Sequence, residues 1–216
     1  MLKRLRSTLK HALRLAIYGT IGVVLTLVVV FVYYLDGRTD LDVWHQADLD
    51  QEFTAESGLV SFQEYLALED RLFTQLDHLV YEQTGPVEND LLNRYRRGSL
   101  SDPERWSRNW NRSYEMPVAI PQASVLLLHG LSDSPYSLRG LAERLHKAGV
   151  HALGLRVPGH GTAPSGLVKT SWQDMAAAVR LAVSHLDSQN GDRPIHIVGY
   201  SNGAALAVHY ALATLD

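Results

Sequence analysis

From Pro121 onward, short apolar runs alternate with longer segments whose apolar residues recur at helical spacing. The apolar runs occupy residues 124–128, 150–157 and 195–198, and the helical patterns between them begin at Ser134 and Ser171. Strands that alternate with helices pair in parallel, because each helix carries the chain back to the same edge of the sheet. The pattern therefore predicts an α/β domain with a mostly parallel sheet over residues 122–216.

The strand predicted at 195–198 runs directly into Gly199-Tyr200-Ser201-Asn202-Gly203, and a helix of small residues follows. A G-x-S-x-G sequence between a strand and a helix is typical of a nucleophile elbow, in which a sharp turn exposes the serine hydroxyl. The two glycines, Gly199 and Gly203, let the backbones of strand and helix pass closely. We predict that Ser201 is a catalytic nucleophile; the alternative is a glycine-rich turn without chemistry.

A second loop, His129-Gly130-Leu131, follows the strand predicted at 124–128. Where an elbow is present, this loop and the residue after the nucleophile each offer a main-chain N–H to the oxyanion of the transition state. The candidate donors are Leu131 and Asn202. We interpret His129 as a residue that fixes the loop by hydrogen bonding, because the base in this arrangement follows the nucleophile in sequence.

Three segments resemble the monoglyceride lipase and serine aminopeptidase branch of the α/β-hydrolase superfamily: VLLLHGLSDSPYSLRGLAERLHKAG, GLRVPGHGTAPSG and GYSNGAA. The resemblance covers roughly residues 120–216. It implies an α/β-hydrolase fold, an acyl-enzyme on Ser201, a small-molecule or lipid-like acyl ester as substrate, and neither a metal nor an organic cofactor. His160 matches a family loop near the site entrance and is interpreted as loop architecture. The chain departs from the family at Asn202, where methionine is common, and at residues 132–134.

The acid and the base of a catalytic triad follow the serine in this fold. After Ser201 the sequence has one histidine, His209, and one acidic residue, Asp216. His209 lies eight residues along the predicted helix, a rise of about 12 Å, which is too far for a general base. We expect a fold truncated after the elbow helix, with little turnover by this chain alone.

The N-terminal region has no charged residue from Leu15 to Leu35. As a helix, this segment is about 31 Å long and matches a bilayer core of ~30 Å. We predict a retained transmembrane helix over 15–35, in preference to a cleaved signal peptide or a buried core helix. Basic residues crowd the tail 1–14 and aspartates follow the helix, so the tail is expected in the cytoplasm and the remainder outside it. In a bacterium that is the periplasmic side of the inner membrane.

Residues 36–121 precede the predicted α/β domain as a linker, an amphipathic helix and a lead-in to the sheet. We interpret 36–60 as linker. The helix starts at Ser61, which forms a capping box with Glu64, and stops at Gly85 and Pro86. It is expected to pack on the core; the alternatives are a cover over the site entrance and a position on the membrane surface.

Arginines and aromatic residues alternate through residues 93–114, the segment called the basic segment below. Such a mixture binds lipid headgroups, anionic substrates or nucleic acid. We interpret it as the lead-in to the first strand with solvated arginines, and an extracytoplasmic position argues against nucleic acid.

Composition narrows the functions further. The formal net charge of -3 is too small to indicate a nucleic-acid partner. The absence of cysteine excludes disulfides, metal thiolates and a cysteine nucleophile. The sequence favours a membrane-anchored serine hydrolase that cleaves acyl esters, with the lipid bilayer as a partner. The alternatives are a non-catalytic membrane-tethered binding protein with a degenerate hydrolase fold, and an acyltransferase.

Overall fold

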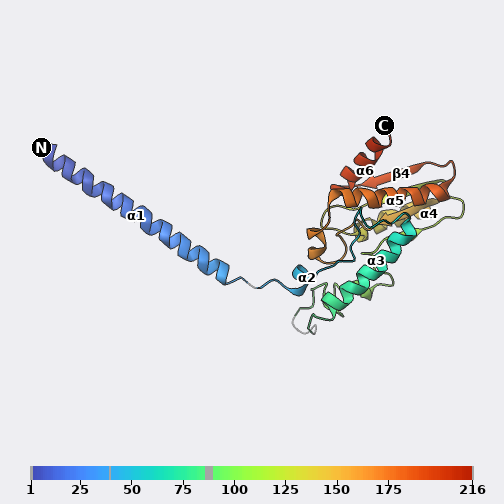
Figure 1. The fold of residues 1–216 in the computed structure, drawn as a ribbon, viewed down its shortest axis with the longest axis horizontal. Helices are drawn as coiled ribbons and strands as arrows, with labels where there is room; N and C mark the ends of the chain where they lie inside the picture. The colour runs from blue at the N-terminus through green and yellow to red at the C-terminus, as the bar shows by residue number, and fades with distance from the viewer. Residues whose placement is uncertain (1, 39, 86–89, 216) are drawn as a thin grey trace. The chain divides into compact units, whose positions relative to one another are not determined.

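The computed structural model of the protein describes residues 2–38, 40–85 and 90–215. The chain forms two compact units, Met1–Leu41 and Asp42–Asp216. The first unit is essentially one helix, α1 (Leu2–Asp36), and the second contains the sheet and the remaining helices (Figure 1).

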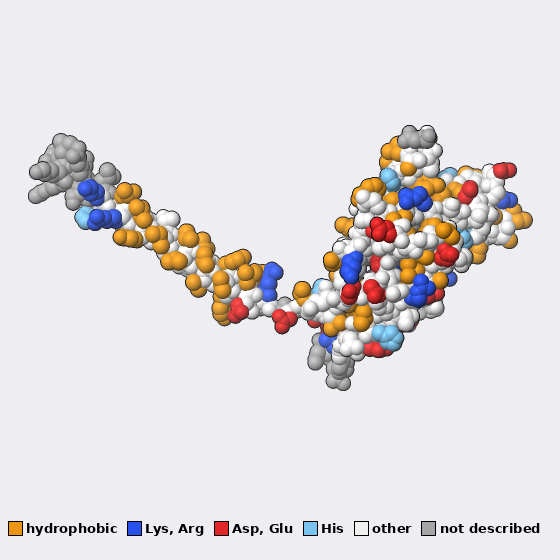
Figure 2. All heavy atoms as spheres, viewed as in Figure 1, with side chains coloured by type: hydrophobic (Ala, Val, Ile, Leu, Met, Phe, Trp, Pro, Cys, Tyr) orange, Lys and Arg blue, Asp and Glu red, His pale blue; other side chains and the backbone are white. Residues whose placement is uncertain are grey.

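Helix α1 contains a stretch, Lys10–Asp36, that is long and apolar enough to cross a membrane. None of the most apolar part of this stretch is buried within the protein, and hydrophobic side chains cover its visible face (Figure 2). An apolar helix without a protein core around it suits a lipid environment. The length and the apolar composition of this stretch are those of a membrane span, and a signal sequence near the N-terminus shares both.

The second unit is built on a four-stranded sheet with the order β1-β3-β2-β4. The strands are β1 (Tyr114–Met116), β2 (Ala123–Leu128), β3 (Val150–Leu155) and β4 (Ile195–Gly199). Strands β3, β2 and β4 are parallel, and β1 pairs antiparallel with β3. Leu128 is level with Leu155 on one side and with Gly199 on the other. The loops after the three parallel strands therefore leave one edge of the sheet together.

Helices cover both faces of the sheet, as the alternating pattern predicted. The short helix η4 (Pro135–Leu138) leads into α4 (Arg139–Lys147), while η5 (Pro164–Val168), α5 (Trp172–Asn190) and α6 (Asn202–Ala213) follow in the chain. Side chains of β2 alternate between the two faces of the sheet. Val125 and Leu127 pack in the same cluster as Ala142 of α4. Leu126 and Leu128 pack in the cluster that contains residues of α5. Trp172 is exposed, although the helical spacing of the apolar residues after Ser171 would place it with Met175 and Val179 on the buried face of α5.

Helix α3 (Phe62–Leu76) confirms the predicted start at Ser61, because Ser61 and Glu64 form the expected capping box. A π-helical turn, η1 (Asp77–Tyr81), continues it. Phe62 and Tyr65 pack in the same core cluster as α5. Of the three positions considered for this helix, packing on the core is the one observed. Farther along the chain, η3 (Pro103–Arg105) is a single turn in the basic segment.

Residues 42–60 differ from the linker that we expected. They contain the short helix α2 (Val43–Gln46), and Leu49, Glu52 and Phe53 are buried. Leu49 packs with residues of α3 and Phe53 joins the main core cluster. The anchoring side chains are irregularly spaced, so the segment has no helical or strand period in its sequence even though it is part of the packed unit.

Candidate active site

Ser201 lies at the turn between β4 and α6, where a nucleophile elbow was predicted. Its φ of 52° and ψ of -122° place a non-glycine residue in a strained backbone region. A Cβ on Gly199 would lie 2.5 Å from the carbonyl carbon and oxygen of Gly203. The side chain of a larger residue at position 199 therefore has no room, and the strand and helix pass as closely as an elbow requires. Ser201 is exposed at the tip of this turn.

The elbow packs directly against the loop that follows β2. A Cβ on Gly203 would collide with the carbonyl oxygens of Leu128 and His129. The main-chain N–H of Tyr200 donates to the carbonyl of Leu128 at 3.4 Å, and a Cβ on Gly130 would lie 2.7 Å from the Tyr200 ring. Both glycine positions therefore allow close approach between the predicted nucleophile turn and the predicted oxyanion loop.

The two candidate oxyanion donors belong to these touching segments. Among the described residues, no main-chain carbonyl accepts a hydrogen bond from the N–H of Leu131 or of Asn202. Both groups are thus free to donate at the edge where the parallel strands end. The side chain of Asn202 contacts α5 instead: its Nδ2 lies 3.4 Å from the sulfur of Met175.

Comparison with known proteins bears on the same part of the chain. Residues 119–216 match the family model described as serine aminopeptidase, S33. A thermostable monoacylglycerol lipase from Bacillus sp. (strain H-257) is 34% identical over 87 residues, which make up 40% of this chain and 34% of that protein. Over these residues the chain is similar to α/β-hydrolases of the serine aminopeptidase family. The chain spans about a third of the length of this curated relative.

One solved structure also shows similarity to this chain. It comes from work on LipS and LipT, two metagenome-derived lipolytic enzymes, and shows 28% sequence identity. The match covers 49% of this chain and 41% of that one, with a TM-score of 0.45.

His129 of the α/β-hydrolase region is fully buried and holds two main-chain groups. Its Nδ1 donates to the carbonyl of Gly130 at 2.9 Å, and its Nε2 accepts from the N–H of Val157 at 3.1 Å. Burial lowers the pKa of His129 to about 4. The ring is therefore neutral at pH 7 and links the loop after β2 to the loop after β3.

His160 packs edge-on against His129, with ring centroids 5.1 Å apart. Its Nδ1 donates to the carbonyl of Pro158 at 2.9 Å. Burial lowers the pKa of His160 as well. These contacts tie the ring to its own loop and to His129. The interpretation of His160 as loop architecture remains a prediction.

A buried ionic cluster beside this loop had no signal in the sequence analysis. Arg156 follows β3 and donates to both carboxylate oxygens of Glu52, at 3.0 and 2.9 Å, and to Glu69 at 3.0 Å. All three side chains are at most 5% exposed. Burial raises the pKa of Glu69, while Arg156 and Ser113 oppose that shift. Arg156 also donates to the carbonyl of His160 at 3.1 Å, so the cluster supports the loop that carries His160.

No described residue is hydrogen-bonded to the Ser201 hydroxyl as a general base would be. His209 instead packs edge-on against Trp172, with centroids 5.1 Å apart. Asp216, the acidic residue after the nucleophile, lies outside the described residues. No group of three or more potential metal ligands occurs among the residues that were placed.

Proposed function

We propose that this chain carries the nucleophile part of a membrane-anchored serine hydrolase that cleaves acyl esters. The observation that carries the proposal is the backbone of Ser201: a strained, exposed serine on a strand-to-helix turn that packs against the loop after β2. A serine is held in such a conformation at a cost of about 1–3 kcal/mol, which is typical of a functional site.

In the proposed reaction, the Ser201 hydroxyl oxygen attacks the carbonyl carbon of the ester while a base removes its proton. The main-chain N–H groups of Leu131 and Asn202 then donate to the negative oxygen that forms. The alcohol leaves when its C–O bond breaks, and water hydrolyses the acyl-enzyme. This chemistry uses neither a metal nor an organic cofactor.

The similarity to a monoacylglycerol lipase supports an ester substrate. The helix over Lys10–Asp36 supports attachment to a bilayer, and the excess of basic residues before it supports a cytoplasmic N-terminus with the hydrolase part on the other side. A lipid-like acyl ester in or near the membrane is the substrate class that fits both features.

Covalent labelling tests the proposal. The native protein, purified from the membrane of its source, is treated with a fluorophosphonate, which phosphonylates activated serines with loss of fluoride. Its peptides are then mapped by mass spectrometry. We expect the label on Ser201, and we expect the Ser201→Ala variant to remain unlabelled. Absence of label, under conditions that label another serine hydrolase in the same membrane, contradicts a catalytic role and favours a binding protein.

The 216-residue chain alone is expected to show little ester hydrolysis, because no described residue activates Ser201. Release of p-nitrophenol from p-nitrophenyl butyrate should be equal for this chain and for its Ser201→Ala variant. Turnover that is lost in Ser201→Ala would show that a base lies within these residues. In the native protein, transfer of the butyryl group to an added alcohol in preference to water would instead indicate an acyltransferase.

A further inference from the structure

Most arginines of the basic segment are paired with carboxylates or carbonyls, but Arg94 is incompletely satisfied. The ion pairs join Arg96 to Asp90, Arg97 to Asp77 and Asp102, and Arg112 to Asp70. Among the described residues, the guanidinium of Arg94 donates to the carbonyl of Gly161 alone, at 3.3 Å. Its Nε is buried, and no described residue accepts a hydrogen bond from it. Most of the donor capacity of this guanidinium is therefore unused by the described residues, and the oxygens of an anion are the acceptors that suit it.

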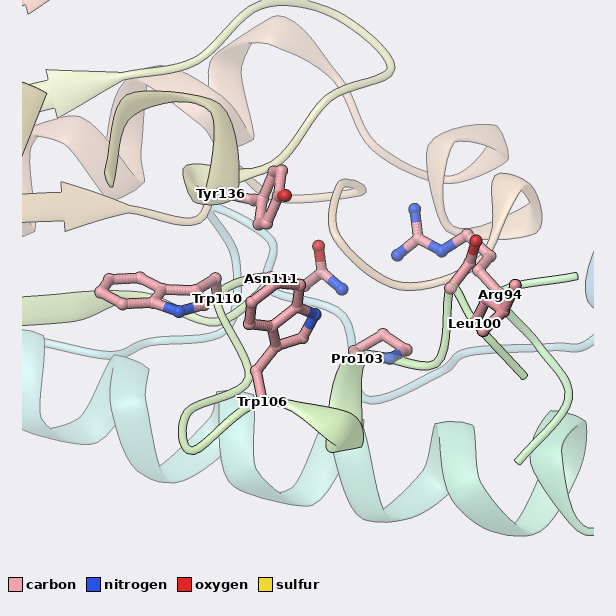
Figure 3. A pocket seen from close by; sticks show the side chains of 8 residues that line it. Arg94, Leu100, Pro103, Trp106, Trp110, Asn111 and Tyr136 are labelled. Atoms are coloured by element: carbon pink, nitrogen blue, oxygen red, sulfur yellow. The ribbon is translucent and has the colours of Figure 1, made fainter. Parts of the chain in front are cut away.

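A cavity of about 300 Å³ opens beside Arg94. Figure 3 shows its lining, which consists of Arg94, Leu100, Ser101, Pro103, Trp106, Trp110, Asn111 and Tyr136. This volume is at the lower end of the range for small-molecule sites, roughly 300–1,000 Å³. No aspartate or glutamate is among these lining residues, so nothing in the wall repels an anion.

Several polar groups of the cavity can donate hydrogen bonds. Asn111 uses its Oδ1 to accept a hydrogen bond from the Ser134 hydroxyl at 2.8 Å, which leaves its Nδ2 to donate. In Figure 3 the guanidinium of Arg94 and the amide of Asn111 face each other across the cavity, and the indole nitrogen of Trp106 lies on the same side as that amide. Convergent N–H donors that include a guanidinium match the oxygens of a carboxylate or a phosphate.

The walls of the cavity are flat and apolar. Trp106, Trp110 and Tyr136 contribute aromatic rings, and Trp106 is 55% exposed although it is a large apolar side chain. Arg108 lies over the Trp110 ring and Arg139 over the Tyr136 ring, at 5.3 and 3.8 Å from the centroids. These two cations, stacked on rings that line the cavity, add positive potential near its opening.

We propose that this cavity binds a small organic anion: a carboxylate or phosphate group on a flat apolar body. The anionic oxygens contact Arg94 and Asn111, and the body lies against Trp106 and Tyr136. Binding in this cavity depends on the residues that line it, and it does not require that Ser201 be catalytic.

Binding is tested with the full chain in micelles of a neutral detergent. The probes are phenyl phosphate and benzoate, with inorganic phosphate as the bare ion and benzyl alcohol as the neutral body. The readout is the nuclear magnetic resonance signal of the indole N–H of Trp106, assigned with the Trp106→Phe variant. We expect both organic anions to shift this signal at lower concentrations than either control. An equal response to benzyl alcohol, or to inorganic phosphate, would overturn the proposal, as would no shift at all.

Two substitutions locate the anion. Arg94→Gln removes the cation, and Asn111→Asp replaces the free donor with a carboxylate while it keeps the acceptor for Ser134. Each should weaken binding of phenyl phosphate about tenfold or more. Arg71→Gln removes an exposed arginine of α3 and should leave the affinity unchanged. If Arg94→Gln alters the circular dichroism spectrum, Asn111→Asp decides; unchanged affinity in a folded Asn111→Asp variant refutes the site.

Discussion

At the scale of single residues, His129 is a positioning residue by its contacts. A neutral imidazole has one donor and one acceptor, and both are used on main-chain groups of two different loops. A protonated ring has no acceptor, so protonation would break the contact with the N–H of Val157. The pKa of about 4 reflects the same preference for the neutral ring, because burial raises the free energy of the charged form.

The pH dependence of unfolding follows from this pKa. In the unfolded chain His129 takes up its proton near pH 6.5, whereas in the folded protein it does so near pH 4. The unfolded state therefore binds more protons between these values, and stability falls as the pH is lowered from 7 to 4, by on the order of 3 kcal/mol from this group. Urea unfolding at a series of pH values measures the loss. His129→Gln, which keeps one donor and one acceptor, should show a flatter profile over this range; an unchanged slope would contradict the assignment.

At the scale of elements, the cluster of Glu52, Arg156 and Glu69 connects three separate parts of the unit. Glu52 comes from the segment before α3, Glu69 from α3 itself and Arg156 from the end of β3. Ser113, just before β1, also donates to Glu69 through its N–H and its hydroxyl, both at 2.9 Å. The cluster thus fixes the N-terminal part of the unit to the edge of the sheet where the candidate site lies.

Removal of one partner from this cluster should be strongly destabilising. Glu52→Gln keeps the shape of the side chain but leaves the Arg156 guanidinium without its bidentate carboxylate, which costs about 3–5 kcal/mol in the free energy of unfolding. The urea midpoint of the full chain in detergent measures the effect. Glu56→Gln changes an exposed carboxylate of the same segment and should have almost none. Equal midpoints for the two variants would show that the cluster contributes little net stability.

At the scale of the whole molecule, the chain divides into a unit made of the apolar helix and a unit that contains the packed domain. Residues 1–41 contain the apolar helix, and residues 42–216 contain the sheet, the buried cluster and the candidate site. The large apolar side chains from Leu13 to Leu35 of α1 are exposed, as those of a helix with no core of its own.

Deletion of residues 1–41 should therefore separate attachment from folding. We expect the full chain to remain in the membrane pellet after extraction with alkaline carbonate, and the shortened chain to be released. The thermal unfolding midpoint of residues 42–216 should match that of the same unit in the full chain. Release of the full chain by carbonate would show that α1 does not span the bilayer, and a lower midpoint after deletion would show that α1 supports the domain.

Local sequence patterns were enough to predict the elements that carry the candidate nucleophile. Strands β2, β3 and β4, the capped starts of α3 and α5, and the strand-to-helix turn at Ser201 all follow from neighbouring residues. Each depends on periodicity, on a capping residue or on a glycine, and these signals act within a few positions along the chain.

Tertiary structure alone decided the contacts between distant segments. The bond from Arg156 to Glu52 joins residues 104 positions apart, and that from Arg94 to Gly161 joins residues 67 apart. Neither pairing leaves a local pattern, because a buried charge or a cavity depends on which surfaces meet after the chain has folded. For this reason the sequence predicted Ser201 and its loop, whereas the packing of residues 42–60, the tautomer of His129 and the donor-lined cavity required the structure.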